Sequence, residues 1–157
     1  STTIQKNYKI NTSYPIISIM ITEQKRGTKS TNNIKKLMPL QRKLQRAIEN
    51  KKFMEPNLTL ASLAHDLGSN RTYLSDLIHQ QFNMSFSDYI NHLRITEAKR
   101  LLETRPEELT DDDGFLFIKN VYVYLGYNCA TSFYRNFKRI VGMSASEYME
   151  SVKDNKK

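Results

Sequence analysis

Two stretches of this sequence carry the same pattern of apolar residues and glycine, 58 residues apart. In the first copy, a glycine follows a series of apolar residues at helical spacing. These residues are Leu60, Leu63, Ala64 and Leu67, and the glycine is Gly68. In the second copy the same offsets return as Ile118, Val121, Tyr122, Leu125 and Gly126. A chain with such a repeat is expected to build one supersecondary unit twice.

The similarity continues after each glycine. A short polar turn leads to a second apolar set, which is Leu74, Leu77, Ile78 and Phe82 in the first copy and Phe133, Phe137 and Val141 in the second. A trailing signature of Met, Ser, Ser, an acid and Tyr then coincides at an offset of 59 residues, from Met84 to Tyr89 and from Met143 to Tyr148. Each copy predicts a helix-turn-helix, in which the glycine reverses the chain at positive φ and the second helix keeps an outward polar face. Such a helix, called the recognition helix below, fits the major groove of DNA.

The residues between the copies predict one long helix over 85–104. Its buried stripe is expected to contain Phe86, Tyr89, Ile90, Leu93, Ala98, Leu101 and Leu102. A helix of about 20 residues is roughly 30 Å long, close to the ~34 Å of one turn of B-DNA. It would hold the two recognition helices about one helical repeat apart on the same side of the duplex. Because both copies run in the same chain direction, we expect an asymmetric DNA site.

The predicted fold class is all-α, with two helix-turn-helix subdomains, a long linker helix, about seven helices in total and a largely irregular N-terminal arm. The expected divisions are a flexible basic arm or linker over 1–36, the double helix-turn-helix domain over 37–151 and a basic tail over 152–157. Within the domain the first motif is predicted over 59–82 and the second over 117–141. The arm contains Ile16, Ile17, Ile19 and Ile21, which favour at most one short strand.

Positive charge is concentrated in the first third of the chain. The net charge is +8 overall, but residues 1–52 carry +10 and the remaining 105 residues carry −2. From Leu37 the apolar spacing predicts an amphipathic helix with a basic side, formed by Arg42, Lys43, Arg46 and Lys51. This positive charge indicates a polyanionic partner, which could be nucleic acid or an acidic membrane surface. A solvated basic tail with no partner explains the same charge equally well. The arm is expected either to add non-specific affinity or to join an upstream module.

The chain resembles the C-terminal DNA-binding domain of the AraC/XylS family of bacterial transcription regulators, over about residues 40–149. The resemblance is carried by Leu60-x-x-Leu-Ala-x-x-Leu-Gly68, Tyr73-Leu74-Ser75, Ser85-Phe86-Ser87-Asp88-Tyr89, Leu93-Arg94-Ile95-x-x-Ala98-Lys99-Arg100-Leu101-Leu102, Gly126-Tyr127, Ser132-Phe133-Tyr134-Arg135-x-Phe137-Lys138 and Gly142-Met143-Ser144. It implies two helix-turn-helix subdomains, binding to double-stranded promoter DNA and activation of transcription through RNA polymerase.

Three departures from the family pattern affect the second motif. Tyr122 stands where the family has a small residue, so the packing there has to open or the helix has to tilt. Ala145 and Met149 replace the family's Pro and Arg after the closing Gly-Met-Ser. The connection from Leu102 to Ile118 is longer than usual and acidic, and acidic side chains near a phosphate backbone would repel it, so the sequence leaves open whether the second motif binds DNA as strongly as the first.

Outward positions of the recognition helices are the candidate DNA contacts. In the first motif they are Asn70, Arg71, Thr72, Ser75, Asp76 and His79, and in the second they are Asn128, Ala130, Thr131, Tyr134, Arg135, Lys138 and Arg139. Arg71 and Arg135 are the candidates for bidentate guanine contacts, and Ala130 or Thr131 for a thymine methyl. Lys138 and Arg139 are expected on phosphates.

Several of these side chains also have structural interpretations. Asp76 is equally well explained as surface charge or as a base contact, and Asn70 as a helix cap, a phosphate contact or both. On the linker helix, Arg94, Lys99 and Arg100 are candidates for contacts with the DNA backbone, or for a solvated face in at least one case. Cys129, the single cysteine, is interpreted as a small residue near a helix cap rather than a redox-sensitive thiol.

The sequence favours no catalytic or metal chemistry. It shows no nucleophile with a base, no phosphate-binding glycine loop, no paired catalytic carboxylates and no metal-ligand spacing among its three histidines and Cys129. We therefore expect no enzyme activity, no cofactor and no metal, and a cytoplasmic protein with no membrane contact by this segment. A chain that starts at Ser1 is interpreted as a piece of a longer sensory regulator, with homodimerisation through parts outside it. The alternative function is a helical protein-interaction module that retains the fold with weak or no specific DNA binding.

Overall fold

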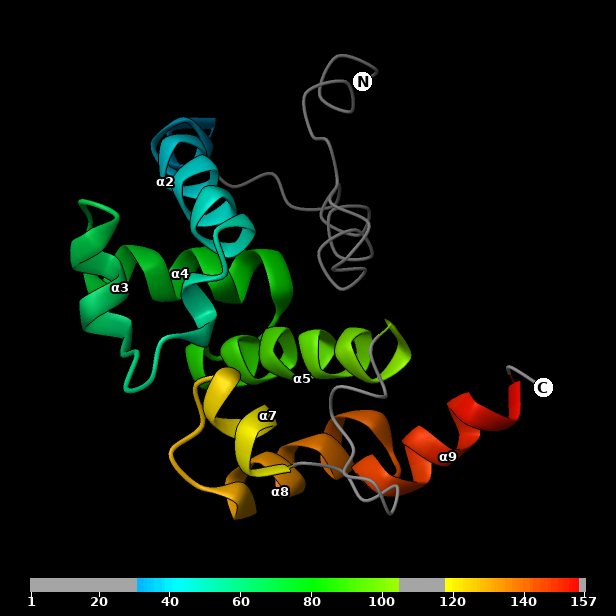
Figure 1. Cartoon of the computed structure of the whole chain (residues 1–157). Helices are drawn as coiled ribbons and strands as arrows, with labels where there is room; N and C mark the ends of the chain where they lie inside the picture. Colours follow the sequence, from blue (N-terminus) through cyan, green and yellow to red (C-terminus); the bar gives the residue numbers. More distant parts are fainter. Residues whose placement is uncertain (1–30, 105–117, 156–157) are drawn as a thin grey trace.

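The computed structural model of the chain describes residues 31–104 and 118–155, and within these ranges the secondary structure is entirely helical. The elements are α2 (Thr31–Glu49), the 3-10 turn η2 (Lys52–Met54), α3 (Leu60–Asp66), α4 (Arg71–Phe82), α5 (Phe86–Thr104), α7 (Ile118–Tyr124), α8 (Ala130–Val141) and α9 (Ala145–Asn155). The prediction of an all-α fold with two helix-turn-helix units and a linker helix is confirmed (Figure 1). The expected strand and most of the acidic connection fall outside the described residues.

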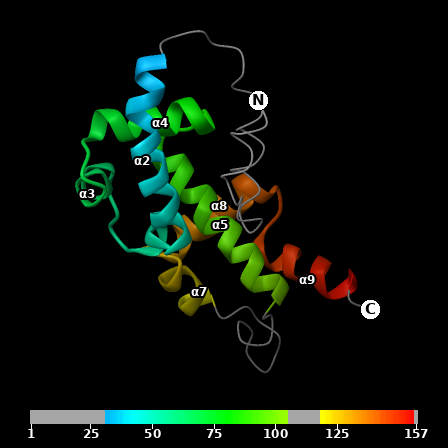
Figure 2. The same ribbon diagram turned by 90° about the horizontal axis from the view of Figure 1, so that it is seen from above.

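Helix α5 lies between two groups of helices. Figure 1 shows α2, α3 and α4 on one side of it and α7, α8 and α9 on the other, and in Figure 2, seen from above, α5 overlaps α8. Each group has its own core, and α5 contributes to both. Its first half, with Tyr89, Ile90 and Leu93, packs into the first core, and its second half packs into the second core through Ile95, Ala98, Leu101 and Leu102. The linker helix is therefore buried between the two groups and contributes side chains to both cores.

Two helices are longer than the apolar spacing indicated. Helix α2 begins at Thr31, six residues before the predicted start at Leu37, and α9 continues to Asn155, into the predicted tail. The added residues at both ends are mostly polar, so the apolar spacing that defined the prediction gave no signal there. Tyr122, the bulky departure in α7, is half-buried against the second core rather than fully enclosed by it.

Both glycine turns have the predicted backbone. Gly68 has φ of +67° and Gly126 has φ of +92°, the left-handed region that glycine adopts without strain. Gly126 also allows close packing, because a Cβ built on it would lie 2.6 Å from the carbonyl oxygen of Met54 and 2.9 Å from Nη2 of Arg94. The turn of the second motif is therefore pressed against η2, which belongs to the first half of the chain.

Arg94 is buried where those two parts meet. Its Nε donates to the carbonyl oxygen of Phe53 at 2.7 Å, and its Nη2 donates to that of Glu55 at 2.9 Å. Its guanidinium carbon lies 5.2 Å from the ring centre of Tyr127. The interpretation of Arg94 as a contact with the DNA backbone is wrong, because its charged group faces the protein interior, with only 9% of the residue exposed.

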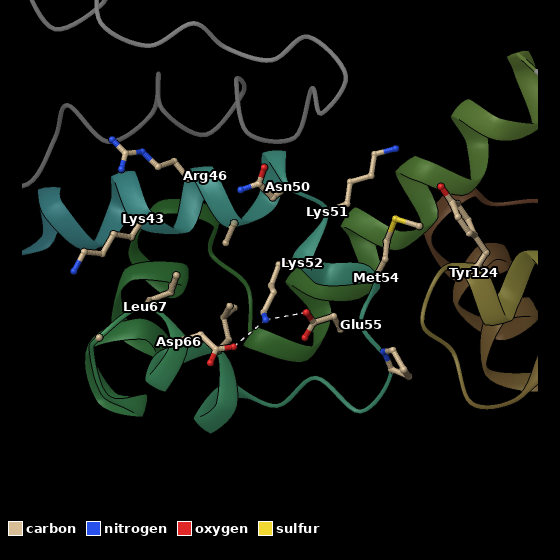
Figure 3. A pocket seen from close by; sticks show the side chains of 14 residues that line it. Lys43, Arg46, Asn50, Lys51, Lys52, Met54, Glu55, Asp66, Leu67 and Tyr124 are labelled. Carbon is tan, nitrogen blue, oxygen red and sulfur yellow. Dashed lines mark ion pairs between the residues drawn. The ribbon is translucent and has the colours of Figure 1, made fainter.

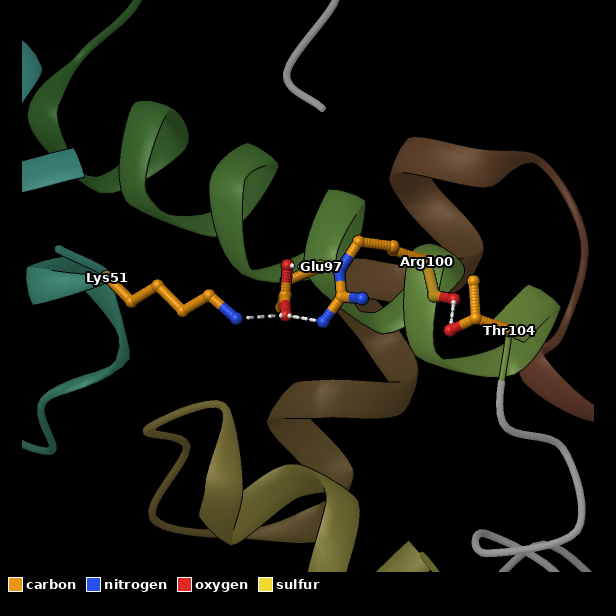
Figure 4. A network of polar contacts seen from close by, with 4 residues as sticks. All are labelled: Lys51, Glu97, Arg100 and Thr104. Atoms are coloured by element: carbon orange, nitrogen blue, oxygen red, sulfur yellow. Dashed lines mark hydrogen bonds and ion pairs between the residues drawn. The ribbon is translucent and has the colours of Figure 1, made fainter. Parts of the chain in front are cut away.

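A second polar cluster joins the end of α2 to α5. Glu97 is 1% exposed, accepts from Nζ of Lys51 at 3.0 Å and forms a fork with Arg100 at 3.0 and 2.6 Å (Figure 4). Burial pushes the pKa of Glu97 upward, but the hydrogen bonds from Arg100 and Lys51 outweigh it and hold the pKa below its ordinary value of 4.5. Arg100 and Lys99 are also engaged within the protein, Lys99 over the ring of Tyr148 at 5.4 Å.

The contrast between two glycines gives a stability test. Gly142, at the end of α8, has φ of +88° and no atom within 4 Å of a built Cβ, so Gly142→Ala should cost about 1–2 kcal/mol from backbone conformation alone. Gly126→Ala should cost a further ~1–3 kcal/mol, because the added methyl overlaps the Met54 carbonyl. Urea unfolding of both variants measures the difference, and equal losses would contradict the close packing.

The Glu97 cluster predicts that the free energy of unfolding falls as the solution becomes acidic. Because the folded chain lowers the pKa of Glu97, the stabilisation is complete above the ordinary pKa of 4.5 and is lost as the pH falls through the folded value. Glu97→Gln should lower the free energy of unfolding at pH 7 by about 1–3 kcal/mol and make it less sensitive to pH between 7 and ~3. Glu150→Gln on the exposed face of α9 is the matched control. Unchanged pH sensitivity in Glu97→Gln would be evidence against this role.

Candidate nucleic-acid interface

Helix α4 separates a buried face from a polar face. Leu74, Leu77, Ile78 and Phe82 are at most 4% exposed, as their spacing predicted. Of the candidate DNA contacts, Asn70, Arg71, Thr72, Asp76 and His79 are exposed and Ser75 is half-buried. The structure therefore brings the six candidates of the first motif to the outward side of one helix and its cap.

An exposed aromatic residue of α4 was not among the candidates. Tyr73 is 52% exposed beside Arg71 and Thr72, at the start of the helix. An aromatic residue in an apolar pattern is usually assigned to the core, which is why the sequence did not identify it. Its position could have been inferred from the helical spacing, because Leu74, Leu77 and Ile78 already account for the buried face.

Helix α8 contains six of the seven candidates of the second motif, and five of these line one depression. A shallow depression of about 510 Å³ is lined by Thr131, Tyr134, Arg135, Lys138 and Arg139. All five are exposed. The two remaining candidates lie at the N-terminal end: Ala130 is half-buried, and Asn128 is exposed and donates through Nδ2 to Oδ1 of Asn57 at 2.8 Å.

The two recognition helices differ in charge. Helix α8 carries Arg135, Lys138 and Arg139 and no acidic residue, whereas α4 carries Arg71 and Asp76. Part of the α8 charge is already engaged, because Nη2 of Arg139 donates to Oδ1 of Asn136 at 2.9 Å and lies 3.6 Å from Oδ1 of Asp88. Arg135 and Lys138 therefore carry most of the exposed positive charge of this face.

The N-terminal ends of the two helices occupy equivalent repeat positions but are capped differently. Asn70 is the N-cap of α4, and its side chain accepts from the backbone N–H of Tyr73 at 3.0 Å. Cys129 is the equivalent residue of α8 and makes no side-chain capping bond. Its Sγ lies 3.2 Å from Oγ of Ser132, and hydrogen bonding by Ser132 lowers the pKa of this exposed thiol. The first repeat thus has a stronger cap than the second.

A groove of about 1030 Å³ runs beside α2, η2 and α3 and reaches Tyr124 on α7 (Figure 3). Two of its four basic residues, Lys51 and Lys52, are paired with acidic residues. Nζ of Lys52 lies 2.8 Å from Glu55 and 3.0 Å from Asp66, and these hydrogen bonds raise the pKa of Lys52. Lys51 binds Glu97. Lys43 and Arg46, both exposed on α2, therefore supply most of the net positive charge of the groove.

Residues 31–104 and 118–155 contain neither a metal-binding cluster nor a membrane-spanning helix. In these ranges no group of three or more His, Cys, Asp or Glu residues is placed to hold a metal ion. Among the same residues, no helix has the length and apolar character required to cross a bilayer.

Comparison with known proteins gives one family and several relatives. The family described as "Helix-turn-helix domain" matches residues 63–151. The chain is 30% identical over 96 residues to the uncharacterized HTH-type transcriptional regulator YtdP of Bacillus subtilis, a match that covers 61% of this chain and 11% of that protein. It is 29% identical over 94 residues to the raffinose operon transcriptional regulatory protein RafR of Pediococcus pentosaceus, covering 60% of this chain and 31% of that protein. The chain thus spans less than a third of the length of either relative.

A solved structure has the same arrangement of helices. The C-terminal domain of AraT, a response regulator from Geobacillus stearothermophilus, superposes with a TM-score of 0.58 at 27% sequence identity. The superposition covers 73% of this chain and 85% of that chain. Because 73% of this chain is covered, the superposition includes both helix-turn-helix motifs and not one of them alone.

The unequal caps predict opposite effects of two substitutions. Asn70→Ala should lower the free energy of unfolding by about 1 kcal/mol, because the N–H of Tyr73 loses its acceptor. Cys129→Ser should raise it by about 0.5–1 kcal/mol, because serine is a better N-cap than the thiol. Thermal unfolding at neutral pH under reducing conditions measures both. A stabilising Asn70→Ala or a destabilising Cys129→Ser would contradict this assignment of the caps.

Proposed function

This chain belongs to the AraC-type helix-turn-helix family of DNA-binding transcription regulators, and we propose that it reads two successive major grooves, with α4 in one and α8 in the next. The observation that carries the proposal is the repeated presentation of a polar helix face, with Arg71 exposed on α4 and Arg135 exposed on α8. The helix between them, α5, has 19 residues, about 28 Å of helix, which is comparable to the ~34 Å turn of B-DNA.

The side chains are proposed to divide between reading bases and holding phosphates. Arg71 and Arg135 are suited to bidentate bonds with guanine, and Thr131 or Ala130 to contact with a thymine methyl. Asp76 would accept from a cytosine amino group or orient an arginine. The remaining candidates, Asn70, Thr72, Ser75, His79, Asn128, Tyr134, Lys138 and Arg139, are proposed to position the two helices on the backbone or to complete the base contacts.

The DNA-binding role is proposed to serve a longer protein. The matched relatives are much longer than this chain, so we infer that it is the output domain of a sensory regulator. RNA polymerase is the proposed second partner, and dimerisation is proposed to depend on segments outside this chain. The role is one of binding inside the cell rather than catalysis, and it requires no cofactor.

Two substitutions on the proposed reading faces should have different signatures. The probe is a duplex selected from a random library by the wild-type chain, measured by fluorescence anisotropy. Arg71→Ala should relax the base preference at one position by about 1–3 kcal/mol. Lys138→Ala should weaken all sequences alike and reduce the slope of log affinity against log salt by about 1. Lys153→Ala, on the exposed side of α9, is the matched control and should change neither quantity.

The same titration separates the proposal from the alternative of a protein-interaction module. Binding through phosphate contacts must weaken steeply as salt rises. The DNA-binding proposal would be rejected if the library selection enriched no sequence and the affinity for DNA did not change with salt. Unchanged affinity and selectivity in both Arg71→Ala and Lys138→Ala would reject the assignment of the reading faces.

A further inference from the structure

The two helix-turn-helix units are joined by a compact set of contacts, the Arg94 junction, formed by Phe53, Glu55, Arg94, Gly126 and Tyr127. We propose that the Arg94 junction sets the separation and angle between α4 and α8, and that Arg94 is therefore a positioning residue for reading a two-part DNA site. This inference rests on the proposed function, because it concerns the geometry with which the two recognition helices meet DNA.

The chemistry of arginine suits this place. A guanidinium presents N–H groups in a rigid planar fork, so one side chain can reach two carbonyl oxygens while its face lies on an aromatic ring. Arg94 uses its Nε for Phe53 and its Nη2 for Glu55, and its face covers Tyr127. Lysine has a single ammonium and cannot reproduce this arrangement.

The junction acts on the segments that lead into both motifs. Glu55 lies five residues before α3 begins at Leu60, and Tyr127 lies three residues before α8 begins at Ala130. Gly126 brings the second of these segments directly against the carbonyl of Met54. A change in the angle between the halves would therefore disturb the Gly126 contact and the packing of Tyr127 on Arg94, and a shift of α5 against the first half would also break the Arg94 hydrogen bonds.

Further contacts around the junction oppose the same motion. The Tyr127 hydroxyl donates to Oδ1 of Asn91 at 2.8 Å, which anchors the ring beneath Arg94 to α5. Asn128 donates to Asn57 at 2.8 Å, a bond between residues 71 positions apart. The Lys51 bond to Glu97 joins the residues that follow α2 to the second half of α5. Asn91, Arg94 and Glu97 follow one another every three residues along one side of α5, so a rotation that breaks one of these contacts is resisted by the others.

The junction is separate from the recognition surface. Arg94 belongs to neither hydrophobic core, and its hydrogen-bond partners lie outside α4 and α8. A substitution there changes the relation between the two units without removing a proposed base or phosphate contact. This separation allows positioning to be measured independently of DNA binding.

The first experiment measures the geometry directly and needs no DNA. Spin labels are attached at Gln80→Cys on α4 and Glu150→Cys on α9, both exposed, in the full chain carrying Cys129→Ser. Double electron–electron resonance then gives the distribution of label distances. We expect a single narrow peak in the parent and a distribution about twice as wide, or with a second peak, in Arg94→Lys, because collective motion of the halves is released.

Controls distinguish positioning from general stability. Phe82→Leu weakens the first core at a site away from the junction and should lower the melting temperature while leaving the distance distribution narrow. If Arg94→Lys does not fold, as judged by circular dichroism, Tyr127→Leu replaces it, because it removes the ring beneath the guanidinium and the hydroxyl bond to Asn91 while leaving Arg94 in place. A distribution in the junction variant no wider than that of Phe82→Leu would overturn the proposal.

The second experiment links the junction to DNA reading. The probe is the library-selected duplex, with one or two base pairs inserted between its two contacted parts. Wild-type binding should fall by at least about tenfold, because the contacts of one recognition helix are lost. Arg94→Lys should bind the original duplex more weakly but lose less than about threefold on insertion, because its halves adjust to either spacing. Equal sensitivity to the insertion in both proteins would overturn the positioning role, whereas the absence of wild-type binding would reject the proposed function and leave the distance test intact.

Discussion

A buried guanidinium requires partners for its charge and for its N–H groups, and Arg94 takes its two carbonyl acceptors from the first half of the chain and its aromatic partner from the second. Burial lowers the pKa of Arg94, with Tyr127 acting in the opposite direction. An unpartnered cation at this depth would be strongly destabilising, so the carbonyls of Phe53 and Glu55 and the ring of Tyr127 must be supplied at once. The Tyr127 hydroxyl is itself enclosed, and burial raises its pKa to about 12. The close contact at Gly126 and the path of the chain into α8 follow from this requirement.

The same dependence explains why the repeat does not make two independent domains. Helix α5 divides its buried residues between both cores, with Leu93 in the first and Ile95 in the second. A helix shared in this way loses part of its stability if either core opens. The two motifs therefore form one body, in which a recognition helix on one side is placed relative to the other through buried contacts of α5.

Much of the architecture could be predicted from the sequence because it is local. The apolar spacing predicted α3, α4, α7 and α8, the two glycines predicted the reversals, and the Ser85 region predicted the start of α5. Arg94 was assigned to the wrong environment, because an arginine within a helix usually faces solvent and its partners lie 39 to 41 residues away. Tyr73 was missed for the opposite reason: an aromatic side chain in an apolar pattern is expected to be buried, but this one is exposed. Which of the predicted reading residues touch DNA is a property of the complex and stays a prediction.

The sequence by itself determined the repeated helix-turn-helix, its polar reading faces and the positions of its turns, because helix periodicity, capping and positive φ depend on residues close along the chain. Only the tertiary structure decided how the two copies differ in packing. The signature tyrosine is buried at Tyr89, where it stacks on Phe82 at 4.5 Å, but is half-buried at Tyr148, where it meets Phe137 edge-on at 5.8 Å. The tertiary structure likewise decided that Arg94 joins the two copies, because burial and hydrogen-bond partners depend on residues that meet only when the chain is folded.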